Sequence, residues 1–363
     1  MINITILTSK NLYQNTIGVL YPLIKWKKKI NNEKIQFKIK YEINDINNSD
    51  VIILDSKFHR NFWITDSKKI YDDLILLKKR CNKLVYCDTA DSSGWIQSEV
   101  FKYVDKYWKF QILKDKELYL KKTYDRRFFT DYYYKILKKK NNLDTSYESE
   151  DWSTAITKED LNKIEVFWNT SLVDYSIKSH FLSLISKKYL KKVYINNSKP
   201  RIYSPSNLRK NNILFNFNSK YSRKCIGFQR QELEKIFIFE KNDRIGRIKY
   251  FKKLRDSKIC LSPFGWGEIT FRDFECFLNG SILLKPNMDH LDTWPNLYQK
   301  NKTYVDFDWG LKDVEEILDK VINNYDKYIN LAFTGQANYH RYLHGDDAEF
   351  LFVSRLKKII ENL

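Results

Sequence analysis

The sequence predicts an α/β protein built from two Rossmann-like, doubly wound domains that face each other across a central cleft. Three observations favour this fold class. The chain has 363 residues, and single cores usually divide beyond about 250–300 residues. Apolar runs alternate with amphipathic helical patterns in both halves, as in βαβ units. No apolar run approaches the roughly 18 residues that a membrane-spanning helix needs.

The first half shows the alternation of strands and helices most clearly. Strands are predicted at 2–7, 35–43 and 50–56, and from 83 into a polar loop that ends at 94. Helical spacing predicts helices over 18–30 and 66–80, and Asp66 or Ser67 stands where a capping residue is expected. The run DVIILDS at 50–56 lacks polar alternation, which is typical of a strand buried on both faces. The region 95–135 is less regular, and 141–160 is predicted to be an ordered surface loop.

A second α/β block follows a predicted hinge at 195–212, which contains Pro200 and Pro205. Its predicted strands lie at 213–218, 258–267 (a strand and loop) and 281–286. Helices are predicted at 175–192, 225–237, 245–257, 268–279, 311–325, 329–343 and 347–363. We therefore expect an N-terminal domain at 1–198, a C-terminal domain at 199–345 and a last helix, 346–363, that packs back on the N-terminal domain.

The composition indicates which classes of partner the protein could bind and in which cellular compartment it is expected. The formal net charge of +19 suits nucleic acid, an anionic membrane or anionic small molecules. The basic residues are spread along the chain, so a solvated surface is favoured over a nucleic-acid groove; short runs at 25–29 and 138–140 could rest on anionic lipid. Five scattered cysteines without a CxxC pair predict neither a disulfide framework nor zinc. The N-terminal apolar run is too short for a signal peptide, so a cytoplasmic location is expected.

Ligands of doubly wound folds bind outside the carboxyl ends of the strands. That rule places the candidate site at the carboxyl ends of the predicted strands, independently of any motif. The predicted strands end at Asp55 and in the loops 88–94, 216–218 and 264–268.

One of these loops opens the stretch SPFGWGEITFRDFECFLNGSILLKP, 262–286. Gly265 and Gly267 permit positive φ and a close approach of the backbone. A glycine loop before a helix offers free N–H groups to a phosphate or a sugar hydroxyl. Helical spacing places Glu268, Arg272 and Glu275 on one face, where a carboxylate could accept both hydroxyls of a ribose. The alternative is a turn and a helix with an exposed ladder of charged side chains.

The segment 257–286, SKICLSPFGWGEITFRDFECFLNGSILLKP, resembles the nucleotide-binding segment of GT-B glycosyltransferases, especially exostosin-like and related bacterial surface-glycan enzymes. The likeness covers about 255–325 and includes TYVDFDWGLKDVEEILDKVI at 303–322. It implies that Glu275 binds the ribose and that the loop Phe264–Glu268, with Trp266 at its centre, faces the diphosphate and the donor sugar. Glu268 and Glu275 are seven residues apart, whereas the commonest pattern of retaining enzymes has eight, so the role of Glu268 and the stereochemical course stay open.

The resemblance implies a cytoplasmic glycosyltransferase that moves a sugar from a nucleotide-sugar donor to a saccharide acceptor. A lipid-linked glycan in surface polysaccharide or lipopolysaccharide synthesis is the expected acceptor, with peripheral contact at the inner membrane face. The C-terminal domain would hold the donor and the N-terminal domain the acceptor. No cofactor and no metal are expected, because side chains and helix ends replace the metal in this architecture. The rivals are a nucleic-acid-binding protein and another Rossmann-like sugar-nucleotide enzyme, such as an epimerase.

A diphosphate leaving group needs nearby positive charge. Arg230 is the candidate, because the planar fork of arginine suits phosphate oxygens. In YDRRFFTDYYY, 124–134, Arg126 and Arg127 stand among aromatic residues that could stack on sugar rings, and we expect both arginines to bind the acceptor.

An inverting transferase needs a general base for the acceptor hydroxyl. Asp91, in the loop after a buried strand, is the first choice, with Asp55, Asp88 and His59 as alternatives. The competing interpretation is that Asp91 only caps a turn, which Asp and Ser clusters commonly do.

Overall fold

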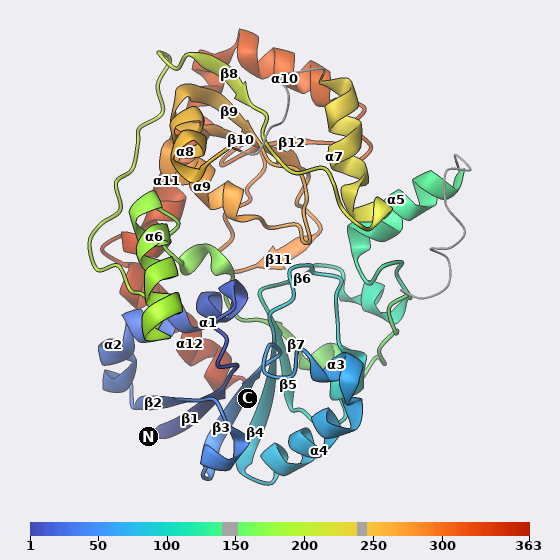
Figure 1. Ribbon diagram of the computed structural model, residues 1–363, viewed down its shortest axis with the longest axis vertical. Helices are drawn as coiled ribbons and strands as arrows, with labels where there is room; N and C mark the ends of the chain where they lie inside the picture. The colour runs from blue at the N-terminus through green and yellow to red at the C-terminus, as the bar shows by residue number, and fades with distance from the viewer. Residues whose placement is uncertain (140–151, 238–244) are drawn as a thin grey trace.

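The computed structural model describes residues 1–139, 152–237 and 245–363. Figure 1 shows two α/β domains, one above the other. The N-terminal domain holds a six-stranded sheet of order β2-β1-β3-β4-β5-β7, and the C-terminal domain a four-stranded sheet of order β12-β10-β9-β8. Every strand pair in both sheets is parallel. The predicted fold class, α/β with two Rossmann-like domains, is confirmed.

The strands of the described residues are β1 (Ile2–Leu7), β2 (Ile35–Lys40), β3 (Ser49–Asp55), β4 (Cys81–Asp88), β5 (Lys106–Lys109), β6 (Gln111–Leu113), β7 (Ile164–Val166), β8 (Asn211–Leu214), β9 (Ser257–Leu261), β10 (Ile282–Pro286), β11 (Leu291–Thr293) and β12 (Val305–Phe307). The α-helices are α1 (Gln14–Lys25), α2 (Lys27–Asn32), α3 (Phe62–Thr65), α4 (Ser67–Lys78), α5 (Phe128–Lys139), α6 (Ile177–Ile185), α7 (Lys224–Ile236), α8 (Arg247–Asp256), α9 (Phe271–Asn279), α10 (Val314–Asn323), α11 (Tyr325–His344) and α12 (Ala348–Glu361).

The N-terminal sheet is buried on both faces, which explains its continuous apolar strands. On β3, Val51 and Ile53 point to the face that α1 and α12 cover. Ile52 and Leu54 point to the opposite face, where α4 packs. Because successive strand residues alternate between faces, one short strand contributes to two cores.

The C-terminal sheet repeats this layering with different helices. Ile259 and Leu261 on β9 pack in one cluster with α7 and α10. Cys260 on β9 and Leu283 on β10 point the other way, toward α8, α9 and α11. The sheet therefore separates two helical layers, and its carboxyl edge is left for loops.

Two further elements join the domains. β6 from the N-terminal half and β11 from the C-terminal half form a two-stranded antiparallel sheet, with Gln111 opposite Thr293. α12 lies on the N-terminal domain, where Phe352 packs 5.0 Å from the ring centroids of both Trp26 and Trp168. The last helix therefore belongs structurally to the first sheet.

Most predicted elements are present, and the differences have local causes. Asp66 caps α4 by accepting a hydrogen bond from Lys69 N at 3.1 Å, as expected. The helix predicted over 268–279 begins only at Phe271, because Thr270 and Asp273 form a capping box there. The aromatic region expected to be irregular contains β5, β6 and α5. Part of the loop predicted at 141–160 lies outside the described residues.

The five cysteines are all free thiols, and Cys81 alone among them is partly exposed. Among the described helices, none combines the length and the apolar character needed to cross a bilayer.

Candidate active site

A cleft of about 840 Å³ opens at the carboxyl ends of β1, β3 and β4. The first turn of α1 forms one wall, and the loop after β4 forms another. Five aromatic side chains line it: Tyr13, Trp63, Tyr71, Tyr86 and Trp95. Four cations also line it: Lys57, Arg60, Arg126 and Arg127. Aromatic faces with cations around them suit a sugar that carries an anionic group.

Arg126 enters the cleft on strained backbone. Asp125 and Arg126 have φ values of 52° and 55°, in the left-handed region that residues with a Cβ rarely adopt. The Arg126 guanidinium lies 5.1 Å from the ring centroid of Trp95, and its Nε is buried without a hydrogen-bond partner among the described residues. Backbone strain of about 1–3 kcal/mol per residue concentrates at functional sites. The strained backbone here holds the Arg126 guanidinium beside the Trp95 ring, and both line the cleft.

The four candidates for the general base have different surroundings. Asp91 is exposed and lines the cleft, and Asn15 Nδ2 donates to its Oδ1 at 2.8 Å. Asp55 is 1% exposed and accepts hydrogen bonds that occupy both oxygens, from Thr8 Oγ1 (2.7 Å), Thr16 Oγ1 (2.7 Å), Thr89 Oγ1 (3.1 Å) and Lys57 N (3.0 Å). His59 is fully buried, with Nε2 3.0 Å from Asp73 Oδ2. Of these three residues, Asp91 alone faces solvent.

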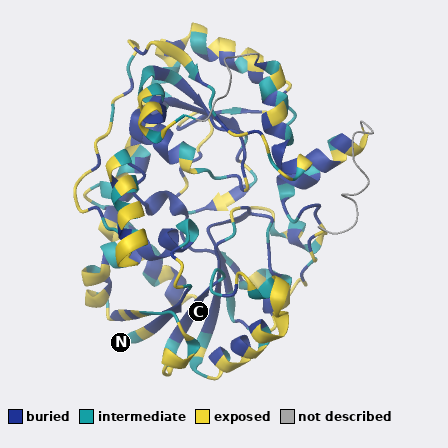
Figure 2. Cartoon of the chain, in the orientation of Figure 1, coloured by how far each residue is buried: buried dark blue, intermediate teal, exposed yellow. Residues whose placement is uncertain are grey.

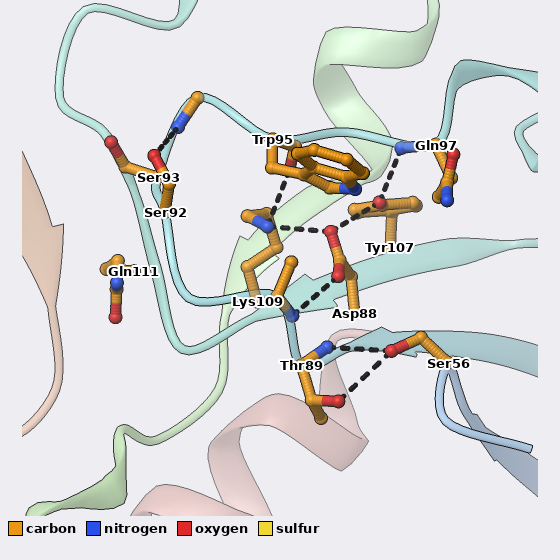
Figure 3. A network of polar contacts seen from close by, with 12 residues as sticks. Ser56, Asp88, Thr89, Ser92, Ser93, Trp95, Gln97, Tyr107, Lys109 and Gln111 are labelled. Carbon is orange, nitrogen blue, oxygen red and sulfur yellow. Dashed lines mark hydrogen bonds and ion pairs between the residues drawn. The ribbon is translucent and has the colours of Figure 1, made fainter. Parts of the chain in front are cut away.

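Asp88, the fourth candidate, belongs to a buried polar network beneath the cleft (Figure 3). Its Oδ2 accepts from Lys109 Nζ and from Tyr107 OH, both at 2.6 Å, and Lys109 also donates to the carbonyl of Trp95 at 2.7 Å. The Asp88 and Lys109 side chains are 2% and 0% exposed. A carboxylate held this way is suited to fixing the cleft floor, and its charge is already neutralised.

Glu268 joins the two domains. It follows the glycine turn of the C-terminal domain, Gly265–Gly267, and is fully buried. Its carboxylate accepts hydrogen bonds from the N-terminal domain: from Ser93 N (3.0 Å), Ser93 Oγ (2.6 Å) and Ser92 Oγ (3.2 Å). Burial tends to raise the pKa of Glu268, but His290 and Ser93 together hold that pKa below its usual range. The carboxylate is therefore an interdomain anchor, and it stays charged.

The glycine turn itself packs against the cleft wall. A Cβ added to Gly267 would lie 1.9 Å from the carbonyl oxygen of Asp91. Arg127, a cleft residue, donates from Nε to the carbonyl of Trp266 at 2.9 Å. Trp266 is 44% exposed at the tip of the turn. The cleft and the turn that the sequence singled out therefore share a border.

We predict that Gly267→Ala weakens the interdomain contact, because a methyl group cannot fit beside the Asp91 backbone. Limited proteolysis and thermal unfolding should show a looser, less stable protein, by about 1–3 kcal/mol. Gly246→Ala is the matched control, since a Cβ at Gly246 meets nothing within 4 Å. Equal stability of the two variants would contradict the packing described here.

Arg230 lies beneath the turn. Its guanidinium donates to three carbonyls, those of Phe264 (2.6 Å), Asn218 (2.8 Å) and Pro263 (3.4 Å). Burial lowers the pKa of Arg230 to about 10. This arginine fixes the loops after β8 and β9 and lends positive charge to their edge, rather than extending freely into solvent.

Glu275 lies one turn into α9, in a group of arginines. It is 3% exposed, and Arg247 Nη2 donates to its Oε1 at 2.5 Å. Burial raises the pKa of Glu275 despite that arginine. The Arg272 guanidinium lies 5.9 Å from the ring centroid of Phe217 and 5.7 Å from that of Tyr250.

Two guanidinium nitrogens in this cluster have no hydrogen-bond partner within the part of the chain that the structure describes. Arg247 Nε and Arg272 Nη1 are buried without a hydrogen bond among the described residues. Buried donors in native proteins are almost always satisfied, so such groups point to a ligand or to ordered water. An anion with several acceptor oxygens, such as a phosphate, would satisfy both.

The structure also brings in residues that sequence reasoning missed. Arg247 and Tyr250 come from α8, whose sequence indicates a helix but no site, and Asn15 comes from the first turn of α1. The described residues contain no group of three His, Cys, Asp or Glu side chains that could hold a metal ion.

No family model matches, and no curated protein matches. Among solved structures, the chain is similar to an alpha-glucosyltransferase in complex with UDP (12% identity, 99% and 100% of the two chains covered, TM-score 0.41). It is also similar to Anabaena HepE in complex with UDP-glucose (9%, 100% and 100%, 0.44) and to a glycosyltransferase from Rickettsia africae (12%, 100% and 99%, 0.43). Similarity at this level establishes neither an activity nor a substrate for this chain.

Proposed function

We propose that the chain is a glycosyltransferase that transfers a sugar from a nucleotide-sugar donor to a saccharide acceptor. The observation that carries the proposal is the border between cleft and glycine turn, where Asp91 and Arg127 line the cleft and contact Gly267 and Trp266. A transferase needs a donor and an acceptor side by side, and this border joins the carboxyl edges of two doubly wound sheets.

The donor belongs, in this proposal, to the C-terminal domain. Glu275 would accept hydrogen bonds from the ribose hydroxyls once Arg247 turns to the phosphates. Arg247 Nε and Arg272 Nη1 are buried donors that a phosphate would satisfy. Their charge would stabilise the leaving group as the glycosidic bond breaks, without a metal ion.

The acceptor belongs to the cleft. Its aromatic walls and polar floor suit a sugar ring, and Arg126 suits a carboxylate or phosphate on that sugar. A growing surface polysaccharide or lipopolysaccharide chain is an acceptor of this chemistry. Asp91 would take the proton of the acceptor hydroxyl, whose oxygen attacks the anomeric carbon while the phosphate of the nucleotide leaves with the bonding electrons.

A nucleotide screen tests the donor half of the proposal. One or more of UDP, GDP, CDP, CMP and their sugars should raise the melting temperature, because a ligand at about 100 times its dissociation constant stabilises the native state by about 2.7 kcal/mol. Incubation of that sugar nucleotide with saccharide acceptors should then yield a glycosylated product. No stabilisation by any nucleotide would overturn the proposal.

Glu275→Ala should abolish the shift in melting temperature that the best nucleotide produces, since the ribose would lose its acceptor. Glu316→Ala, an exposed acidic residue on α10, is the control and should keep the full shift. Because the alanine also leaves Arg247 unpaired, Glu275→Gln is measured beside it, with circular dichroism to verify folding. An unchanged shift in both Glu275 variants removes this residue from the site.

A further inference from the structure

One helix carries its large apolar side chains on the outside. α6 and the π-helix that continues it, η7 (Ser186–Leu190), expose five such residues. They are Phe181 (41% exposed), Leu184 (50%), Ile185 (55%), Tyr189 (70%) and Leu190 (63%). We call these five residues the α6 apolar face. Single exposed apolar residues are common, but a contiguous group on one element marks an interaction surface.

The inner side of the same helix carries two buried serines and Ile177, which packs against the hydrophobic core. Ser179 and Ser186 are 2% and 7% exposed, and the helix packs on α8. Ser176 caps α6 by accepting a hydrogen bond from Ser179 N. Figure 2 shows exposed residues along α6 at the edge of the molecule. The helix is therefore anchored by its serines and by Ile177, while most of its large apolar side chains face the surroundings, unlike those of a core helix.

Lysines cluster at one end of the α6 apolar face. Lys187, Lys188, Lys191 and Lys192 lie at its C-terminal end, and the helix ends at Lys191, which has a left-handed φ of 49°. No Asp or Glu occurs between Asp174 and Glu232. Apolar side chains beside an uncompensated basic cluster are the pattern of helices that lie in the interface of an anionic bilayer.

Other partners fit this surface less well. Leucine and isoleucine neither stack on bases nor pair with phosphates, so a bound nucleic acid would leave these side chains of the α6 apolar face exposed to water. A second copy bound symmetrically through the same face would bring eight lysines into one interface, and this segment offers no acidic residue to pair with them. The apolar part favours hydrocarbon, and the lysines favour lipid phosphates.

We propose that the α6 apolar face docks this protein on an anionic membrane surface. The five apolar side chains enter the headgroup region, and the four lysines lie against lipid phosphates. The docking surface is separate from the cleft, since none of its residues lines the cleft. It therefore goes beyond sugar transfer and would hold even for a protein of different activity.

Vesicle sedimentation tests the proposal with the full chain. The protein should sediment with vesicles of equal parts phosphatidylglycerol and phosphatidylcholine, and far less with phosphatidylcholine alone. Leu184→Ser with Ile185→Ser should weaken partitioning at least tenfold, because burying each side chain is worth roughly 1.5–3 kcal/mol. Lys191→Gln with Lys192→Gln should weaken vesicle partitioning about fivefold for each lysine. Added salt should also weaken it, because salt screens the attraction between lysines and lipid phosphates.

Matched controls distinguish vesicle binding by the α6 apolar face from nonspecific binding through other exposed apolar or basic residues. Phe350→Ser removes a ring that is 66% exposed on α12, and Lys302→Gln with Lys327→Gln removes two exposed charges from the C-terminal domain. Both should bind vesicles as the unmodified chain does. Equal loss in the controls would overturn the proposal. So would concentration-dependent dimers or oligonucleotide binding that the Leu184 and Ile185 changes abolish while vesicle binding persists.

Discussion

Asp91→Asn is expected to lower the rate of sugar transfer by about 10²–10⁴-fold while leaving nucleotide binding intact. General-base catalysis contributes a factor of this size. The amide keeps the shape of the side chain and its contact with Asn15 but cannot take the proton of the acceptor hydroxyl. Turnover with saturating donor, together with the nucleotide-induced shift in melting temperature, separates the chemical step from binding.

Glu99→Gln is the matched control for Asp91→Asn, because Glu99 is also an exposed carboxylate on the cleft lining. It should leave turnover within a few-fold of the unmodified chain. A shared loss in both variants would mean that the cleft needs negative charge in general, and the assignment of Asp91 would be wrong.

Much of the fold could be predicted because strands buried on both faces leave a strong sequence signal. The continuous apolar runs ending at Asp55 and Asp88 became β3 and β4, with neighbouring strands in parallel register. The short strands β5 and β7 were missed since the first has only four residues and the second three. Such strands are specified by their neighbours in the sheet more than by their own pattern.

The candidate site was predictable only in its parts. The glycine turn and the loop after β4 were singled out by residue type, but their contact depends on how two domains pack. Sequence spacing suggested that Glu268 and Glu275 share a helix face, whereas the capping box at Thr270 leaves Glu268 outside the helix and free to reach Ser92 and Ser93. Periodicity describes one element at a time, and tertiary contacts lie beyond it.

The polar floor of the cleft shows the same limit, because nothing local marks a lysine as buried. Lys109 ends β5 beside the carboxyl end of β4, so parallel register brings its ammonium group to Asp88. Tyr107, two residues earlier on the same face, supplies a second donor. Register therefore builds the network that positions Trp95, whose ring stacks with the cleft arginines.

Lys109→Met is expected to destabilise the protein by about 3–5 kcal/mol, since it leaves the Asp88 carboxylate buried without a counter-charge. Thermal unfolding should show a fall of roughly 2–4 °C for each kcal/mol. Lys106→Met, on the same strand but with a solvent-exposed hydrogen bond to Asn162, should change stability by at most about 0.5 kcal/mol.

Adding Asp88→Asn to Lys109→Met should restore part of the lost stability, because the double variant contains no unpaired buried charge and Tyr107 can still donate to the amide oxygen. This non-additivity distinguishes a buried ion pair from simple loss of packing, for which the two changes would sum. If the double variant unfolds as early as the summed single changes predict, the Lys109 ammonium and the Asp88 carboxylate act independently, the first through the Trp95 carbonyl and the second through the Tyr107 hydroxyl. The cleft floor would then depend on separate hydrogen bonds rather than on the ion pair.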